Sequence, residues 1–171
     1  MFEINFIFNT RTVEDLRREV QKRVERKELD LLIVDYLQLM DTTAKYRDEH
    51  LRVGNVSKAL KGMALDFNIP VVSLAQVNRD TDGSLPTLRN LKDSGNIEQD
   101  ADGVIFLHRP TDSTDSSIDP RDKANFDLLR KKGYDYIVIA VAKQRQGTTG
   151  MASVLFDKAH MRYVIIDREG R

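Results

Sequence analysis

Short runs of branched, apolar residues recur along the chain and constrain its fold more than any other feature. Four of them cover residues 29–34, 71–75, 104–107 and 136–142. Runs of this length and composition are typical of β-strands buried in a sheet. They are far shorter than the roughly 20 apolar residues that a membrane-spanning helix needs, so we expect no membrane segment.

Segments with helical periodicity separate the first of these runs. Thr12 is a predicted N-cap, with Asp15 three residues later, for a helix whose apolar positions recur from Val13 to Val24. A second helix is predicted over 47–66. Strands that alternate with helices predict an α/β fold, with a mostly parallel sheet flanked by helices.

The two ends of the chain predict further strands. Alternating apolar residues over 2–8 predict a short strand with one buried face. Residues 151–156 and 163–166, which follow a turn with two glycines, predict an antiparallel hairpin at the C-terminal end of the sheet.

Polar segments lie between the later strands. We expect a long mobile loop over 78–96 and a disordered, Ser/Asp-rich surface loop over 109–120. Residues 122–132 are a predicted helix.

Composition limits the class of protein. The 171 residues, of which 40% are hydrophobic, suffice for one domain over 1–171, and the absence of cysteine excludes a disulfide framework, a Cys-based zinc site and a thiol nucleophile. The three widely spaced histidines are assigned structural roles. The N-terminus lacks a signal-peptide pattern, so we expect a cytoplasmic protein. Lys and Arg number 27 and so do Asp and Glu, which leaves any nucleic-acid contact to a local basic surface.

Polar residues directly follow two of the predicted parallel strands. Asp35 ends the run 31–34, and Gln76 ends the run 71–75. Ligands of open parallel sheets bind at the carboxyl ends of strands, where an acid can face a nucleotide-bound Mg²⁺ and an amide can bind a phosphate or a water. Two simpler interpretations stay open: Asp35 begins a turn, and Gln76 hydrogen-bonds loop backbone.

Lys143 and Arg145 lie at the end of the run 136–142, just before the glycine turn at Gly147. Residues two apart share one face of an extended strand, so both cations can project onto one phosphate. The alternative is an edge strand that its charges protect from aggregation.

The stretch 91–102 is expected to be a loop that closes into a short helix. Lys92 and the backbone N–H groups near Ser94 and Gly95 can bind a phosphodiester without reading sequence. A plain polar loop is the alternative.

Four blocks of sequence, taken in order, resemble the motifs of one protein family. They are 32–40 (LIVDYLQLM), 69–79 (IPVVSLAQVNR), 94–102 (SGNIEQDAD) and 143–147 (KQRQG). They resemble the DnaB-family replicative DNA helicases over nearly the whole chain. The resemblance implies a RecA-like ATPase core with an antiparallel C-terminal hairpin, ATP and Mg²⁺ as cofactors, single-stranded DNA as a partner, and a hexameric ring.

The resemblance also implies roles for single residues. Asp35 corresponds to the Walker B carboxylate that holds Mg²⁺ through water, and Gln76 to the γ-phosphate sensor. Arg145 corresponds to the arginine finger that reaches a neighbouring subunit's nucleotide, with Lys143 beside it. The loop that grips the DNA backbone contains Lys92, Asp93 and Gly95.

The chain departs from the family in its phosphate-binding motif. None of its nine glycines is followed by lysine, so the P-loop motif Gly-x-x-x-x-Gly-Lys-Ser/Thr is absent. We therefore expect the N-terminal part of the ATPase domain to be missing. A fragment or the product of a split gene is the favoured explanation, and in a split gene a separate N-terminal fragment is a partner; an expressed single domain and a decayed relative that still assembles are the alternatives. The connection 109–136 also looks longer than in the family.

Two functions remain. The first is the C-terminal part of a replicative DNA helicase, which unwinds DNA with ATP as a ring and is inactive without Walker A. The alternative is a non-catalytic RecA-like module that binds DNA or interacts with a helicase. A metal-dependent phosphoesterase built on Asp35 lacks a second convergent carboxylate or histidine cluster.

Overall fold

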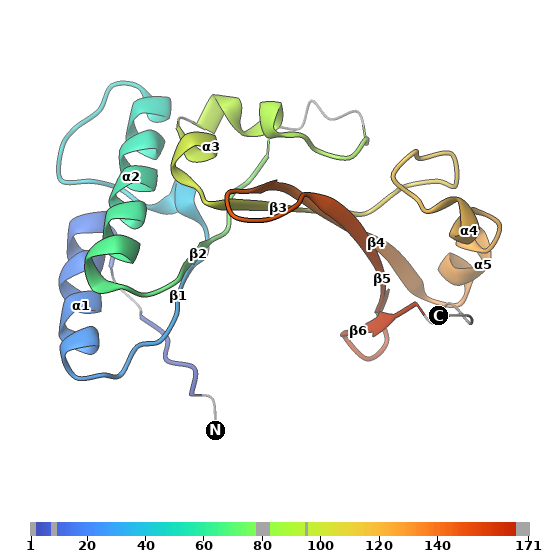
Figure 1. The fold of residues 1–171 in the computed structure, drawn as a ribbon, viewed down its shortest axis with the longest axis horizontal. Helices are drawn as coiled ribbons and strands as arrows, with labels where there is room; N and C mark the ends of the chain where they lie inside the picture. The colour runs from blue at the N-terminus through green and yellow to red at the C-terminus, as the bar shows by residue number, and fades with distance from the viewer. Residues whose placement is uncertain (1–2, 8–9, 78–82, 95, 167–171) are drawn as a thin grey trace. The chain divides into compact units, whose positions relative to one another are not determined.

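The computed structural model describes residues 3–7, 10–77, 83–94 and 96–166. The chain divides into two compact units, which are described separately (Figure 1). The first contains residues 1–77 and 91–101, and the second contains residues 78–90 and 102–171. A single domain over 1–171 stays a prediction.

The first unit consists of helices and a small parallel sheet. Its elements are α1 (Val13–Glu25), β1 (Leu32–Val34), the 3₁₀ helix η1 (Leu37–Leu39), α2 (Glu49–Phe67), β2 (Val71–Ser73) and α3 (Ile97–Asp100). A second 3₁₀ helix, η2 (Leu88–Ser94), precedes α3. The two long helices and both strands occur where the periodicity predicts them.

Both long helices begin at a side-chain cap. The Thr12 hydroxyl accepts a hydrogen bond from the Asp15 backbone N–H at 3.1 Å, which confirms the predicted N-cap of α1. Asp48 caps α2 in the same way through the backbone N–H of His50. At its other end α2 stops at Asn68, whose left-handed backbone (φ 50°) breaks the helical repeat.

β1 and β2 pair in parallel, with Leu32, Ile33 and Val34 opposite Val71, Val72 and Ser73. Leu32 and Val34 are buried in the core that α1 and α2 form. The opposite face is uncovered: Ile33 is 60% exposed and Val72 is 50% exposed. The expected burial of these strands therefore holds for one face only.

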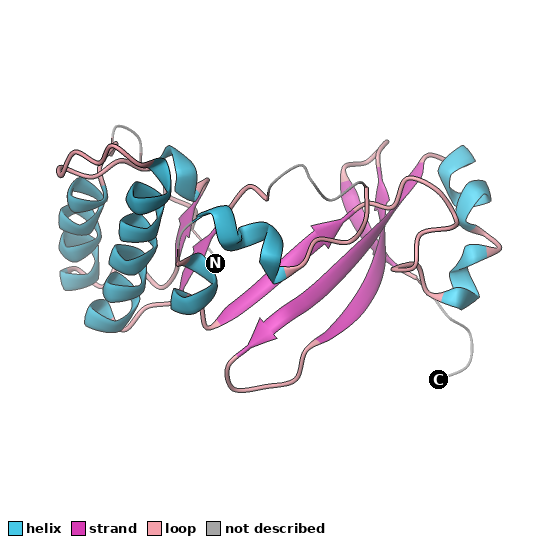
Figure 2. Cartoon of the chain, turned by 90° about the horizontal axis from the view of Figure 1, so that it is seen from above, coloured by secondary structure: helices cyan, strands magenta, loops and turns pink. Residues whose placement is uncertain are grey.

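The second unit is built on a four-stranded antiparallel sheet, seen as the long strands of Figure 2. Its order is β3 (Gly103–His108), β4 (Tyr134–Gln144), β5 (Gly150–Asp157) and β6 (Arg162–Ile165). The α/β class with a parallel sheet and a C-terminal antiparallel hairpin is confirmed. The antiparallel part is larger than expected, because β3 pairs with β4 rather than with a parallel neighbour.

The segment after β3 is ordered, so the prediction of a disordered loop over 109–120 is wrong. Asp115 accepts hydrogen bonds from the backbone N–H and the hydroxyl of Ser117, at 2.8 and 2.6 Å. Directly after the turn that these bonds close, Ile118 is buried with Phe126 in the core of the second unit. The predicted helix over 122–132 forms as two short helices, α4 (Pro120–Lys123) and α5 (Phe126–Lys131).

Buried polar pairs fasten this segment to the sheet. His108 Nε2 lies 2.7 Å from Asp115 Oδ2, and the Tyr136 hydroxyl donates to Asp122 Oδ2 at 2.7 Å. Burial opposes ionisation of Asp115, but hydrogen bonds from Ser117 and His108 outweigh it and lower the pKa of this carboxyl. The pairs give buried polar side chains hydrogen-bond partners within the unit.

Two other expectations fail. Residues 3–7 form no strand, and the side chains of Ile4 and Phe6 are exposed, because no strand of the described residues pairs with them. Of the expected mobile loop over 78–96, residues 78–82 and 95 lie outside the described residues, whereas 88–94 form η2.

Candidate functional site

The carboxyl ends of β1 and β2 meet at one edge of the parallel sheet. Asp35 comes directly after Val34, which is opposite Ser73, so Asp35 and Leu74 are at matching levels. Gln76 follows two residues later. Asp35 and Gln76 are both exposed, and the Asp35–Tyr36 peptide bond is cis. The structure thus places these two predicted site residues at the same end of neighbouring strands, as expected of a ligand site in an α/β sheet.

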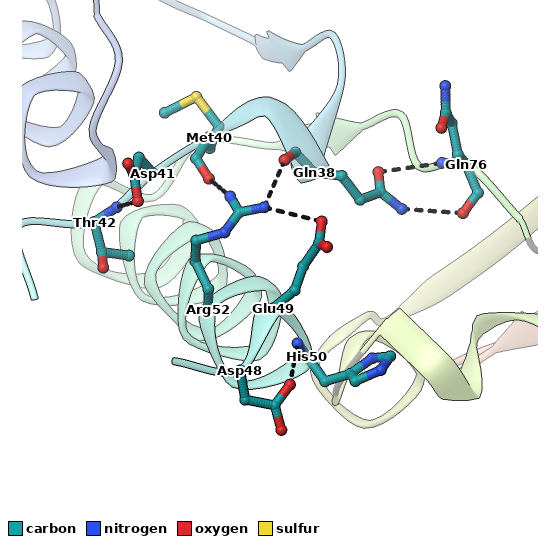
Figure 3. Close-up of polar contacts among 9 residues, drawn as sticks. All are labelled: Gln38, Met40, Asp41, Thr42, Asp48, Glu49, His50, Arg52 and Gln76. Carbon is teal, nitrogen blue, oxygen red and sulfur yellow. Dashed lines mark hydrogen bonds and ion pairs between the residues drawn. The ribbon is translucent and has the colours of Figure 1, made fainter. Parts of the chain in front are cut away.

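Gln38 holds the main chain at Gln76. Its side-chain Nε2 donates to Gln76 O at 3.0 Å, and its Oε1 accepts from Gln76 N at 3.2 Å (Figure 3). Both bonds use main-chain atoms of Gln76, whose side chain points away from Gln38. The side chain that binds loop backbone in these two bonds is that of Gln38, and the alternative in which the Gln76 side chain does so stays a prediction.

Arg52, on α2, holds the turn that carries Gln38. Its guanidinium donates to the carbonyl oxygens of Met40 and Gln38, the latter at 3.1 Å, and pairs with Glu49 at 3.2 Å (Figure 3). The guanidinium therefore binds two carbonyls at the end of η1 with charge-assisted hydrogen bonds. Sequence reasoning missed both Gln38 and Arg52; the one available signal was the position of Gln38 three residues after Asp35.

Lys143 and Arg145 belong to the second unit. Lys143 is in β4 opposite Val104, whereas Arg145 lies in the turn beyond the strand. Its backbone N–H donates to Asp102 O at 2.8 Å, and its Nη1 lies 3.2 Å from Asp102 Oδ1. The prediction of two cations on one extended strand is thus wrong for Arg145, because the strand ends at Gln144.

Gly147 follows this turn and lies against the side chain of Gln144. A Cβ at Gly147 would lie 2.8 Å from Cγ of Gln144, so a larger residue would require this exposed side chain to shift.

The predicted DNA-contacting residues lie around η2. Lys92 and Asp93 fall within this 3₁₀ helix, and Gly95 lies outside the described residues. Leu91 and Ile97, on either side, are buried in the first unit and anchor the segment. In α3, Asp100 Oδ2 is buried without a hydrogen-bond partner among the described residues.

Acidic and histidine side chains form no metal-binding cluster in the described part of the chain. Within residues 3–7, 10–77, 83–94 and 96–166, no group of three or more His, Cys, Asp and Glu side chains could hold a metal ion. None of the helices described there is long and apolar enough to cross a membrane.

The fold is similar to solved helicase ATPase domains. The chain matches one solved ATPase domain with a TM-score of 0.72 and 25% identity, over 92% of this chain and 52% of that one. It also matches a chain of a DnaB-like replicative helicase, solved in a study of its interactions with primase, with a TM-score of 0.74 and 25% identity, over 95% of this chain and 36% of that one. The fold is therefore that of a RecA-like helicase ATPase domain.

The sequence agrees with this class. Residues 4–164 match the family described as DnaB-like helicase C terminal domain, and the chain belongs to that family. It is 33% identical to the replicative DNA helicase DnaB of Helicobacter pylori (strain ATCC 700392 / 26695), over 88% of this chain. It is 34% identical to the protein of the same name from Leifsonia xyli subsp. xyli, over 89% of this chain. The chain spans 36% and 31% of the lengths of these two relatives, about a third.

Proposed function

We propose that the chain forms the part of a replicative DNA helicase that faces Mg²⁺ and the terminal phosphate of ATP. The observation that carries the proposal is the parallel pairing of β1 with β2, which brings Asp35 and Gln76 to one edge of a sheet. A carboxylate and an amide at that edge are the groups that nucleotide hydrolysis needs there: one for the cation and one for the phosphate or the attacking water.

Asp35 is the proposed Mg²⁺ residue. It directly follows β1, whose residues Leu32 and Val34 are buried in the core, and Asp35 itself is exposed and can reach a ligand. A single carboxylate fits Mg²⁺, which keeps several waters and takes its other ligands from substrate phosphates. When bound, Mg²⁺ neutralises charge on the phosphates. The phosphates themselves need a cradle of backbone N–H groups, and no P-loop motif occurs in these 171 residues.

A P-loop segment is therefore the proposed complement of this chain. Two observations support it. Apolar side chains on the open face of the first unit, Ile33, Val72 and Leu74, are about half exposed. Asp100 Oδ2 is a buried acceptor that lacks a donor among the described residues. A segment packed on this unit would cover the exposed apolar side chains and could donate a hydrogen bond to Asp100. Both changes are favourable, because exposed apolar surface and a buried acceptor without a donor each cost free energy.

Arg145 and Lys143 are proposed to act on a nucleotide held by a neighbouring subunit. A guanidinium supplied from another subunit stabilises the charge that develops during phosphoryl transfer, so hydrolysis depends on assembly. The proposal thus includes a ring of subunits, and the resemblance to the family implies that this ring is a hexamer. The side chain of Arg145, in the turn after β4, is 54% exposed, which supports a contact with another subunit.

Single-stranded DNA is the proposed second ligand. Lys92 and Asp93 fall within η2, and the buried residues Leu91 and Ile97 border this segment in the sequence; Gly95, the third proposed contact, lies outside the described residues. A short segment held at both ends can present a lysine and backbone N–H groups to phosphates, which positions a strand without reading its sequence. Binding of this kind weakens as salt rises.

The residue assignments can be tested by reconstitution. The chain would be mixed with a segment of a DnaB-family helicase that carries the motif Gly-x-x-x-x-Gly-Lys-Ser/Thr, called the P-loop segment below. Turnover of ATP with Mg²⁺ is expected to fall at least a hundredfold in Asp35→Asn, since the carboxylate that orients the cation is lost. Asp66→Asn, which removes an exposed carboxylate paired with Arg17 in the same unit, is the matched control. Equal turnover by Asp35→Asn and the control would refute the assignment.

A non-catalytic DNA-binding module is the second candidate function, favoured by the missing phosphate cradle. It predicts that the chain alone binds a single-stranded oligonucleotide, more weakly as salt rises, and that Lys92→Ala weakens this binding. Absence of binding at low salt would exclude this module.

A further inference from the structure

The hydrogen-bond ladder between β1 and β2 continues past the ends of both strands. Leu74 N donates to Val34 O at 2.9 Å, and Leu37 N donates to Leu74 O at 2.8 Å. In a parallel ladder every second residue of a strand faces a given neighbour, so the next residue of this segment to face β1 is Gln76. At that level the main chain after β1 has turned into η1 and no longer runs beside it.

The side chain of Gln38 makes the two hydrogen bonds to Gln76 that a neighbouring strand would otherwise make. A primary amide carries the same donor and acceptor as a peptide group, and here it binds both main-chain groups of Gln76, at 3.0 and 3.2 Å. The side chain thus replaces a strand over one residue. Without it, Gln76 N–H and C=O would have no partner in β1 and the backbone would be free to rotate.

Gln38 is in turn fixed from α2. Its own carbonyl accepts a hydrogen bond from Arg52 at 3.1 Å, and the guanidinium, whose side chain is only 21% exposed, also binds Met40 O. Glu49, on the same helix, pairs with Arg52. The main chain of η1 is therefore bound to a long helix rather than held only by its own turn.

We propose that Gln38 is a positioning residue for Gln76. The proposal rests on the proposed function, in which the Gln76 amide binds the terminal phosphate of ATP or the attacking water. The two hydrogen bonds from the Gln38 side chain fix the main-chain N and O atoms of Gln76. They leave the Gln76 side chain, which points away from Gln38, to bind a ligand (Figure 3). Gln38 therefore lowers the freedom of a group that must be in place during the chemical step, and it makes no contact with the nucleotide itself.

Variants of Gln38 and Gln76, a control variant and two measurements test this role. Gln38→Met keeps the length of the side chain and removes both hydrogen bonds, whereas Gln38→Glu keeps an acceptor for Gln76 N–H. Gln21→Met, at an exposed glutamine of α1 in the same unit, is the control. The first measurement is hydrogen exchange of the Gln76 amide by NMR in the chain alone. The second is kcat and KM for ATP with Mg²⁺ in the mixture with the P-loop segment.

The expected results separate positioning from general stability. Gln38→Met is expected to speed exchange of the Gln76 amide and to lower kcat about tenfold, the scale of one lost hydrogen bond, with little change in KM. Gln38→Glu retains part of the protection, and Gln21→Met matches the wild type. Because both residues act through one group, Gln38→Met adds little to the loss in Gln76→Ala.

Several outcomes would overturn the proposal. They are unchanged exchange of the Gln76 amide in Gln38→Met, a wild-type kcat in that variant, or multiplied losses in the double variant. A wild-type mixture that forms a complex and hydrolyses no ATP would instead refute the proposed function. An active wild type with an equally active Gln38→Met variant would refute the role of Gln38 alone.

Discussion

Arg145 is joined to Asp102 twice, by a main-chain hydrogen bond of 2.8 Å and by a side-chain ion pair of 3.2 Å. The main-chain bond holds the turn after β4 against the start of β3. The ion pair lies at the surface, because the side chains of Arg145 and Asp102 are 54% and 58% exposed. Pairs at such exposure contribute at most about 1 kcal/mol, so the guanidinium can exchange Asp102 for a phosphate of another subunit at little cost.

Asp102→Asn is therefore expected to leave the mixture with the P-loop segment active. The substitution weakens an exposed ion pair and keeps the main-chain bond, so the thermal unfolding midpoint should change little. Arg145→Ala removes the proposed finger and is expected to lower ATP turnover at least a thousandfold. Arg17→Ala, which breaks a similarly exposed pair with Asp66, is the control. A loss in Asp102→Asn as large as that in Arg145→Ala would show that the pair itself is needed.

Tyr136→Phe is expected to destabilise the second unit. The Tyr136 hydroxyl donates to the buried Asp122 at 2.7 Å, and burial, with this hydrogen bond, raises the pKa of the tyrosine. Removal of the hydroxyl takes one hydrogen bond from this buried carboxylate, and hydrogen bonds to charged groups contribute roughly 1.5–3 kcal/mol. Urea denaturation would measure the loss, with Tyr163→Phe at an exposed tyrosine as the control. Equal stability of the two variants would contradict the expectation.

The stability of the second unit is expected to fall in acid. Hydrogen bonds from Ser117 and His108, opposed by burial, lower the pKa of Asp115 in the folded chain. A carboxyl with a lowered pKa stabilises the fold above its unfolded pKa of about 3.9, and this contribution is lost as pH falls through the folded value. Asp115→Asn should flatten the decline of the unfolding midpoint below pH ~4. The control, Asp127→Asn on α5, should decline as the wild type does, and identical curves for all three would exclude Asp115 as a cause.

Ile33→Thr is expected to weaken binding of the P-loop segment while sparing the chain itself. Ile33 is 60% exposed on the open face of the parallel sheet, so its loss should change the free energy of unfolding by less than about 0.5 kcal/mol. Covering such a side chain in a complex contributes about 1.5–3 kcal/mol, so binding should weaken at least tenfold. Calorimetry would measure the affinity, with Leu128→Gln on α5 as the control. An unchanged affinity would mean that another surface takes the segment.

The sequence predicted those parts of the fold that local pattern determines. Thr12 with Asp15 marks the start of α1, and branched apolar runs mark β1, β2 and β4, because capping and strand propensity act over a few residues. The prediction of a strand over 2–8 was wrong for residues 3–7, because alternating apolar and polar residues do not by themselves provide a neighbouring strand to pair with. The loop after β3 was misjudged because its order depends on Asp115, whose partners Ser117 and His108 were not foreseen from composition.

The candidate site divides in the same way. Asp35 and Gln76 could be found because strand ends are visible in a sequence. Gln38 and Arg52 could not be assigned roles, because the first binds a residue 38 positions away and the second binds carbonyls 12 and 14 positions away. Such contacts depend on how β1, β2 and α2 pack. The ion pair of Arg145 with Asp102 likewise joins residues 43 positions apart and depends on the pairing of β3 with β4.

ATP turnover in three samples tests the central claim most directly: the chain alone, the P-loop segment alone, and the two mixed with Mg²⁺ and a single-stranded oligonucleotide. The claim is that this chain supplies one side of an ATP site and the P-loop segment supplies the other. It predicts background turnover in each sample alone and clear turnover in the mixture, lost in Asp35→Asn. Robust turnover by the chain alone, or none in a mixture shown to form a complex, would contradict it.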